Sequence, residues 1–193
     1  MPKASSSRLT PMEVQKVLTA VRSARHGVRD YAMLLTLYHH GLRVSELCRL
    51  TQADLDLEGR MIWIERLKGG RSGAHPVPEN EAQALGEYLE ERKTEGTLAL
   101  PALFLNERGA PLSRNAVYYL IRRAGEMAEI GRPLYPHLFR HAAGYKLAGD
   151  GHDVKLIQDY LGLRSARSAL RFVSPQAETG SGDERFAGLW TES

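Results

Sequence analysis

The sequence offers little that could cross-link the chain or anchor it in a membrane. Cys48 is the single cysteine among 193 residues, so no internal disulfide can form. No apolar run approaches the length of a membrane-spanning helix, and Met1 to Ser7 lacks the apolar core of a signal peptide. These absences predict a protein of the reducing cytoplasm, without a membrane partner, whose stability comes from one hydrophobic core.

The usual sequence signatures of metal and cofactor sites are also missing. There is no glycine-rich phosphate loop and no Cys/His spacing typical of zinc. The histidine pairs His39 with His40 and His137 with His141 stand apart from other types of metal ligand. We therefore expect neither a metal ion nor an organic cofactor.

Charge is nearly balanced in total but uneven along the chain. Lys and Arg number 26 against 23 Asp and Glu, for a formal net charge of +3. Between Arg108 and Ser174, eleven basic residues accompany five acidic ones, whereas Glu79 to Glu95 carries six Glu and two basic residues. This asymmetry predicts that the basic half of the chain binds a polyanion and that the acidic helix faces solvent. A polyanion partner of this kind would place the protein at the nucleoid.

Hydrophobic periodicity predicts a mainly α-helical domain with a small antiparallel β-sheet. The stretch from Thr10 to Glu13 is typical of a capping box with proline in the first turn, and Ser45 and Ser113 are placed to cap later helices. Alternation predicts strands over Arg60 to Leu67 and Ala74 to Pro78. Helices are expected from Pro11 onward and over 29–39, 46–50, 80–93, 114–130, 136–149, 154–161 and 165–172.

Two polar side chains three residues apart suggest an anion site. His137 and Arg140 would lie on one side of a helix, where both could hold a single anion. Arg43 lies in a turn between apolar Leu42 and Val44, which fixes its position. The competing interpretation of Arg43 is a surface arginine that binds helix carbonyls.

Other basic residues could extend such a site. Lys68 lies at the tip of the predicted hairpin, although a lysine at a tip is usually a solvated charge. On the helix over 114–130, an ordinary solvated face explains the outward arginines about as well as DNA contact does. The residues expected to contact DNA are Arg43, Lys68, Arg71, Arg114, Arg122, Arg140 and Arg164.

Four stretches of the sequence carry a family resemblance in a fixed order. They are GLRVSEL with Arg43, Lys68 on a hairpin, HLFRH with His137 and Arg140, and KLIQDYLG before a short terminal helix. Together they resemble the catalytic domain of the tyrosine recombinases, the phage integrase superfamily, over about Thr10 to Trp190. Through PHLFRHAAGYKLA, DVKLIQDYLG and RFAGLW the chain is most similar to the small fimbrial-switch invertases.

The resemblance implies strand exchange in DNA by phosphoryl transfer without a metal. In that family a tyrosine attacks a phosphodiester, forms a 3′-phosphotyrosyl link and releases a 5′-hydroxyl, which attacks the partner strand. By resemblance, Arg43 and Arg140 would clamp the non-bridging oxygens, because a planar fork of donors suits phosphate. Lys68 would protonate the leaving oxygen, and His137 would orient or deprotonate the attacking hydroxyl.

Two positions depart from the family pattern. Where the family reads LGH, this chain has Leu163 after Gly162. Nine residues later, the position of the nucleophilic tyrosine holds Phe172. Phenylalanine has no hydroxyl, and loss of a nucleophile costs on the order of 10⁶-fold in rate. An engineered Tyr-to-Phe change would explain Phe172 but not Leu163, so we favour natural decay of the site.

The other tyrosines do not supply an obvious replacement. We expect each of them to be a core or surface aromatic; they are Tyr118, Tyr119, Tyr145 and Tyr160. The sequence therefore predicts a DNA-binding recombinase homologue that does not cleave DNA and serves as an accessory or regulatory subunit. Two alternatives stay open. One is an active recombinase whose nucleophile lies elsewhere or was mutated, and the other is a protein-interaction module without DNA binding.

The expected organisation is one catalytic domain with two short extensions. A flexible lead covers residues 1–9, a tyrosine-recombinase-type domain covers 10–173, and a Gly/Ser-rich linker with a docking tail covers 174–193. The apolar residues Phe186 and Trp190 of the tail would dock on this molecule or on a neighbour, and the family resemblance favours a neighbour in a DNA-bound assembly. That neighbour would be a second copy of this chain or an active recombinase.

Overall fold

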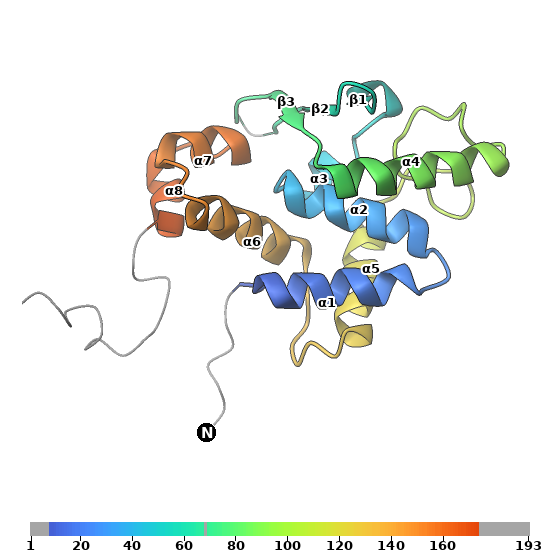
Figure 1. Ribbon diagram of the computed structural model, residues 1–193, viewed down its shortest axis with the longest axis horizontal. Helices are drawn as coiled ribbons and strands as arrows, with labels where there is room; N and C mark the ends of the chain where they lie inside the picture. The colour runs from blue at the N-terminus through green and yellow to red at the C-terminus, as the bar shows by residue number, and fades with distance from the viewer. Residues whose placement is uncertain (1–7, 68, 174–193) are drawn as a thin grey trace, which may run out of the picture.

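The structure, a computed structural model, describes residues 8–67 and 69–173. It is mainly helical with a small antiparallel sheet, which confirms the predicted fold class. In Figure 1 helices α7 and α8 lie at one end of the molecule, and α6 extends from them toward α1 and α2 in the middle. The elements are α1 (Pro11–Arg22), α2 (Gly27–His39), α3 (Val44–Leu47), η1 (Gln52–Asp54), β1 (Leu55–Asp56), β2 (Met61–Ile64), β3 (Gly73–Pro76), α4 (Glu79–Thr94), α5 (Arg114–Met127), α6 (Pro136–Gly149), α7 (Val154–Leu161) and α8 (Ala166–Val173).

Local sequence signals set several helix ends as predicted. Thr10 caps α1, and the reciprocal hydrogen bonds of a capping box join it to Glu13. The side chain of Ser113 accepts a hydrogen bond from the backbone of α5. Gly162 ends α7 with a φ of 60°, a left-handed conformation that glycine adopts without a steric penalty.

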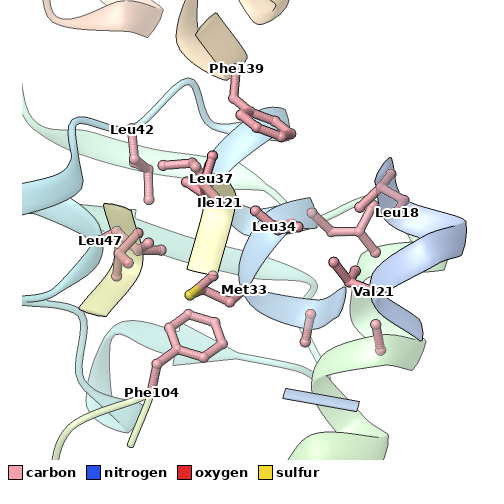
Figure 2. Packing of buried hydrophobic residues seen from close by; sticks show 14 of the residues in the cluster. Leu18, Val21, Met33, Leu34, Leu37, Leu42, Leu47, Phe104, Ile121 and Phe139 are labelled. Atoms are coloured by element: carbon pink, nitrogen blue, oxygen red, sulfur yellow. The ribbon is translucent and has the colours of Figure 1, made fainter. Parts of the chain in front are cut away.

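Helix α2 is the centre of the main hydrophobic core. It contacts α1, α4 and α6, which explains why its apolar residues extend nearly all round the helix. Figure 2 shows side chains from several elements packed around Met33 and Leu34 of α2, among them Leu18, Ile121 and Phe139. Because α6 brings Phe139 into this core, the segment that carries His137 and Arg140 is held rigidly against α2.

The three strands form one sheet in the order β1-β2-β3, all antiparallel. Ile62 and Ile64 of β2 are fully buried, and Trp63 is 50% exposed on the opposite face, as the alternation predicted. The return strand covers Gly73–Pro76, one residue earlier than predicted at its start and two at its end. Strand β1 was not predicted, since two residues are too few to show a period.

A second, smaller group of buried apolar residues, the C-terminal cluster, joins α6, α7 and α8. Its buried members are Ala143, Ile157, Leu161, Ala169 and Phe172. Since α6 contributes Phe139 to the main core and Ala143 to this cluster, one helix connects the two.

Three details differ from the sequence prediction. The short helix begins at Val44 with Arg43 as its N-cap, so the prediction that Ser45 caps it is wrong. Helix α4 is not simply a solvent-facing helix, because Glu81 and Arg92 on it are 0% and 1% exposed. The packed domain already includes Leu9, which is 2% exposed.

The terminal parts of the predicted organisation lie mostly outside the described residues. These are residues 1–7 of the lead and the whole of the tail over 174–193, with Phe186 and Trp190. Their roles stay predictions. Within the described part of the chain, no helix combines the length and hydropathy required to cross a membrane.

Candidate functional site

Arg43 is held in place by the backbone turn that begins α3. Its backbone N–H donates to Oε2 of Glu46 at 2.8 Å, and its Nη1 donates to Oε1 of the same carboxylate at 2.6 Å. Its Nη2 donates to the carbonyl oxygen of Gly162 at 3.1 Å. The side chain remains 21% exposed, so Arg43 is both fixed and accessible to solvent.

Arg140, on α6, meets Arg43 at the same place. Its Nη1 donates to the carbonyl oxygen of Gly41 at 2.5 Å, and its Nη2 donates to that of Leu161. Gly41 has a φ of 54°, which favours glycine, and a Cβ atom there would also lie 2.4 Å from Cδ2 of Leu161. Arg140 is 2% exposed. Burial, followed by the charges of Arg43 and Arg66, lowers the pKa of Arg140, although a guanidinium stays protonated at neutral pH.

A third arginine, Arg66, lies beside these two and was not predicted as a site residue. Its Nη1 donates to Oε2 of Glu46 at 2.8 Å, and its Nη2 donates to the carbonyl oxygens of His40, at 2.7 Å, and Tyr160. The sequence did contain a signal. The alternation of strand β2, continued by two residues, places Arg66 on the buried side, where an arginine needs several hydrogen-bond partners.

We call Arg43, Arg66 and Arg140 together with Glu46 the arginine cluster. All three guanidinium groups donate to carbonyls at the C-terminal end of α7, where the negative end of the helix dipole favours cations. Burial would raise the pKa of Glu46, but hydrogen bonds from Arg43 and the charge of Arg66 lower it, so this carboxylate is ionised. Among the described residues, Glu46 is the one carboxylate within 4.0 Å of these arginines, and a positive excess remains.

The hairpin that carries Lys68 lies against the arginine cluster and the end of α7, through Leu67 before Lys68 and Gly70 after it. Lys68 itself lies outside the described residues. The carbonyl oxygen of Leu67 accepts a hydrogen bond from Nη1 of Arg43 at 3.4 Å. A Cβ atom on Gly70 would lie 2.6 Å from the carbonyl oxygen of Gly162, so the hairpin loop passes directly against the end of α7.

His137 and His141 lie one turn apart on α6 and continue the site toward α8. Their ring centroids are 4.7 Å apart, and His141 lies 6.1 Å from the ring of Phe172. Burial and then the charges of Arg140, Arg171 and Arg43 lower the pKa of His137. Burial, His137 and the same arginines on α6 and α8 lower the pKa of His141 to about 4. Burial and the nearby arginines therefore favour the neutral form of both imidazoles.

Phe172 lies in the C-terminal cluster with 5% of its surface exposed. Its ring packs over Gly144 so closely that a Cβ atom there would lie 2.5 Å from the ring edge. The ring of Tyr145 approaches it edge-on at 5.2 Å. Leu163 is half-buried and also packs against this cluster. The two positions that depart from the family pattern therefore belong to one apolar group, next to His141.

The other tyrosines are occupied or lie on other surfaces. Tyr160 donates its hydroxyl hydrogen to the carbonyl oxygen of His39 at 3.0 Å, and burial raises its pKa to about 12. Arg8 lies over the ring of Tyr145, with Cζ 4.4 Å from the centroid. Tyr118 and Tyr119 are exposed on α5. These positions agree with the prediction that the tyrosines are core or surface aromatics.

The remaining predicted DNA contacts fall outside the arginine cluster. Arg71 is exposed and lies 3.8 Å from Asp159. Arg114 and Arg122 are exposed on α5, where Arg122 pairs with Glu126 at 3.3 Å. Arg164 is exposed in the segment between α7 and α8. Of the residues predicted to contact DNA, Arg43 and Arg140 therefore lie together in the arginine cluster, whereas these other arginines are spread over the surface.

A buried polar network contacts α7 at Tyr160. Glu81 lies between His39 and His40, with Oε2 to Nδ1 of His39 at 2.8 Å and Oε1 to Nε2 of His40 at 3.1 Å. The ring of His75 packs on Tyr160 at 4.1 Å and edge-on to His40 at 5.4 Å. Burial, with the charges of Arg66 and His40, lowers the pKa of His75 to about 3. Sequence reasoning missed this network because its members come from four separate elements.

No metal site accompanies these groups. Within residues 8–67 and 69–173, no three or more His, Cys, Asp or Glu side chains are grouped so that they could hold a metal ion. What the arrangement can do chemically is bind an anion through guanidinium donors, next to neutral imidazoles and an aromatic ring without a hydroxyl.

Comparisons with known proteins agree with this geometry. The sequence model of the phage integrase family matches residues 7–178. The type 1 fimbriae regulatory protein FimE of Escherichia coli K12 is 44% identical over 183 residues, which are 94% of this chain and 89% of FimE. The crystal structure of XerA recombinase superposes with a TM-score of 0.80 at 26% identity, over 100% of this chain and 68% of that one.

A further solved structure shares the fold. The integrase of the Tn1549 transposon, in complex with transposon right-end DNA, has a TM-score of 0.76 at 23% identity and covers 97% of this chain and 66% of its own. The family match spans most of the sequence, and the fold agrees along the whole described chain. The protein therefore belongs to the phage integrase family, the tyrosine recombinases.

Proposed function

We propose that the protein binds double-stranded DNA in the manner of a site-specific recombinase but does not cleave it. The observation that carries this proposal is the pairing of the arginine cluster with Phe172. Arg43 and Arg140 converge on the end of α7, where Leu161 belongs to the same apolar cluster as Phe172, an aromatic ring that has no hydroxyl. The phosphate-binding half of the chemistry is present and the nucleophilic half is absent.

The arginine cluster has donors to spare for a phosphate. A guanidinium group carries five N–H donors in a planar fork, and the protein engages only some of those on Arg43 and Arg140. The Arg43 side chain is partly exposed to solvent, whereas Arg140 is buried against the end of α7. A DNA phosphate would contact Arg43 first, and contact with Arg140 requires the end of α7 to shift.

Cleavage fails in this proposal for two independent reasons. Phe172 has no oxygen with which to form a covalent phosphodiester link. Leu163 adds an apolar side chain where the family pattern has a histidine donor, so the transition state would also lose a hydrogen bond. The hydroxyl of Tyr160 donates to a backbone carbonyl and is not available as a substitute.

The biological role that fits a binding-only recombinase is accessory or regulatory. FimE is named as a regulatory protein, and the Tn1549 integrase with this fold was solved on DNA. We propose that this chain occupies recombination-type sites, alone as a homo-oligomer or together with an active recombinase. The alternative of an interaction module without DNA binding is disfavoured because Arg43 and Arg140 share Glu46 instead of pointing to different faces.

The decisive experiment is a suicide-substrate assay. DNA sites are first selected from a random pool by binding to the protein, and nicked duplexes of those sites are then incubated with it. On a denaturing gel we expect no covalent protein–DNA band. A band would contradict the proposal in favour of an active enzyme, and mass spectrometry of the adduct would name the nucleophile.

Two variants separate a lost nucleophile from wider decay. We expect no covalent protein–DNA band from Phe172→Tyr alone. The double variant Phe172→Tyr with Leu163→His should form this adduct, because it restores both the nucleophile and the hydrogen-bond donor. An adduct with Phe172→Tyr alone would show that only the nucleophile is missing.

Binding itself is tested by its salt dependence. Affinity for the selected duplex should fall steeply with salt, by about 10³-fold or more between about 50 and 200 mM if several phosphates are contacted. Arg43→Gln should reduce the slope of log affinity against log salt by about 0.9, the value for one lost phosphate contact. Lys93→Gln, at the end of the acidic helix α4, should leave this slope unchanged. Absence of salt-sensitive binding by the unaltered protein would overturn the proposal.

A further inference from the structure

Arg171 is an exposed arginine in the last turn of α8, next to the ring that replaces the nucleophile. Its Cζ lies 4.9 Å from the centroid of the Phe172 ring, which is within the range of a cation–π interaction. That ring is 6.1 Å from His141, which in turn is 4.7 Å from His137. A continuous row of contacts thus connects Arg171 with the two imidazoles of α6.

The charge of Arg171 acts on the residues of the candidate site. Burial is the first cause of the lowered pKa of His137 and His141, and the charge of Arg171 is a further cause for both. The same charge is one of those that lower the pKa of Arg140. Arg171 therefore lies close enough to the arginine cluster to add to its positive field.

Nothing in the described part of the chain neutralises Arg171. By contrast, a lysine on each of the two helices that contact α8 is paired within its own helix: Lys146 of α6 lies 2.6 Å from Asp150, and Lys155 of α7 lies 2.9 Å from Asp159. Arg171 has no carboxylate within 4.0 Å among the described residues, and it adds to a cluster in which three arginines share Glu46. Like charges held together repel one another, so an anion that binds between them would be favoured.

A purely structural reason for Arg171 also exists. A cation in the last turn of a helix interacts favourably with the helix dipole, by about 0.3–1 kcal/mol. That reason explains a basic residue at the end of α8, but it does not explain why the side chain lies against the ring of Phe172, which His141 also contacts.

We propose that Arg171 is a further phosphate-binding residue of this site. It would hold the DNA phosphate from the α8 side, opposite the arginines of α3 and α6. This inference rests on the proposed DNA binding by the arginine cluster and deepens it. In this site Arg171, which lies beside Phe172 at the position of the family's tyrosine, would contact the phosphate diester as an additional cation.

The test compares Arg171→Gln with Arg167→Gln. Both residues are exposed on α8, one turn apart, and both changes remove one charge from the same helix. Affinity for the selected DNA duplex is measured over a range of salt concentrations. We expect Arg171→Gln to reduce the slope of log affinity against log salt by about 0.9, the value for one lost phosphate contact, and Arg167→Gln to leave it unchanged. Equal slopes for the two variants would overturn the inference.

A second measurement does not depend on DNA. Inorganic phosphate is titrated into the protein while the ring C–H resonances of His137 and His141 are followed by NMR. We expect phosphate to shift both resonances in the unaltered protein and to bind several-fold more weakly to Arg171→Gln. Without phosphate, Arg171→Gln should raise the pKa of both histidines, since it removes a cause of their depression.

These outcomes distinguish the inference from the proposed function. DNA binding that is salt-sensitive but insensitive to Arg171 overturns the inference and leaves the proposed function standing. Phosphate binding that depends on Arg171, without DNA binding, overturns the proposed function and supports the anion site. If the unaltered protein binds neither probe, both proposals are wrong.

Discussion

At the scale of single residues, Glu46 determines whether the arginine cluster can exist. Its two carboxylate oxygens accept hydrogen bonds from Arg43 and Arg66, and Arg140 lies 4.0 Å away. Glu46 is 3% exposed, so water does not screen these charges. A buried carboxylate that neutralises several guanidinium groups cannot be removed without leaving them uncompensated.

Glu46→Gln should therefore destabilise the fold strongly. We expect the free energy of unfolding to fall by about 3–5 kcal/mol, the cost of breaking a buried ion pair. Urea titration followed by circular dichroism measures this change. The matched control is Glu90→Gln on α4, whose side chain is 74% exposed and which should change stability by no more than about 0.5 kcal/mol. Equal stability of the two variants would show that Glu46 is not the centre of the cluster.

At the scale of secondary structure elements, the docking of α8 on α6 depends on one glycine. Gly144 leaves room for the ring of Phe172, and a Cβ atom there would lie 2.5 Å from that ring. Because α8 carries both Phe172 and Arg171, this contact also positions the cation proposed to bind phosphate.

Gly144→Ala should destabilise the protein although alanine favours helix formation. The helix propensity of alanine contributes about 1 kcal/mol, whereas overpacking against the Phe172 ring costs about 1–3 kcal/mol. Thermal unfolding measures the difference. The control is Gly149→Ala, at the end of the same helix with nothing within 4 Å, which should be neutral or slightly stabilising.

The origin of that loss can be tested with a double variant. Combining Gly144→Ala with Phe172→Leu should recover part of the stability, because the smaller side chain vacates the space that the new methyl group requires. If the two changes simply add, the close contact between the ring and Gly144 does not limit the docking of α8.

At the scale of the whole molecule, the arrangement of buried histidines makes stability depend on pH. The folded state lowers the pKa of His75 to about 3 and of His141 to about 4, against about 6.5 in an unfolded chain. The unfolded state therefore binds more protons in that interval. The stability that these groups contribute is complete above pH 6.5 and is lost as the pH falls toward 4.

Two acidic groups modify this dependence at lower pH. Burial would raise the pKa of Glu81, but the charge of His40 and the hydrogen bonds from His39 and His40 lower it to about 2. The stability that Glu81 contributes is therefore lost as the pH falls below about 4.5. Burial raises the pKa of Asp30, which acts in the opposite direction near its ordinary range. Between pH 6.5 and 5 the dominant groups are the three histidines whose pKa is lowered in the folded state, His75, His141 and His137.

We expect His75 and His141 together to decrease the free energy of unfolding by up to about 2.7 kcal/mol per pH unit in that interval, the limit for two protons, and His137 to add to this slope in the same direction. Urea titrations at several pH values give the slope directly. His75→Phe should reduce the slope by up to about 1.4 kcal/mol per pH unit, the limit for one proton, whereas His152→Asn, at an exposed position, should not alter it. A slope that is the same in both variants would contradict the assignment to His75.

Sequence and structure contributed differently to the candidate site. Arg43, His137 and Arg140 were predicted from local spacing and family resemblance, and the structure brings them into one region. Arg66, Glu46 and Arg171 were not predicted, because each acquires its role from partners on other elements. Lys68 and the tail residues Phe186 and Trp190 stay predictions, since they lie outside the described residues.

The sequence by itself determined most of the helices, the caps at Thr10 and Ser113, and the family, because these depend on residue type and on spacing along a few turns. Only the tertiary structure decided that three arginines donate to the end of α7 around one carboxylate, and that Phe172 packs over Gly144. The physical reason is that charge pairing and close packing depend on distance in space. Residues as far apart in the chain as Arg43 and Gly162 come into contact only when the two hydrophobic clusters have formed.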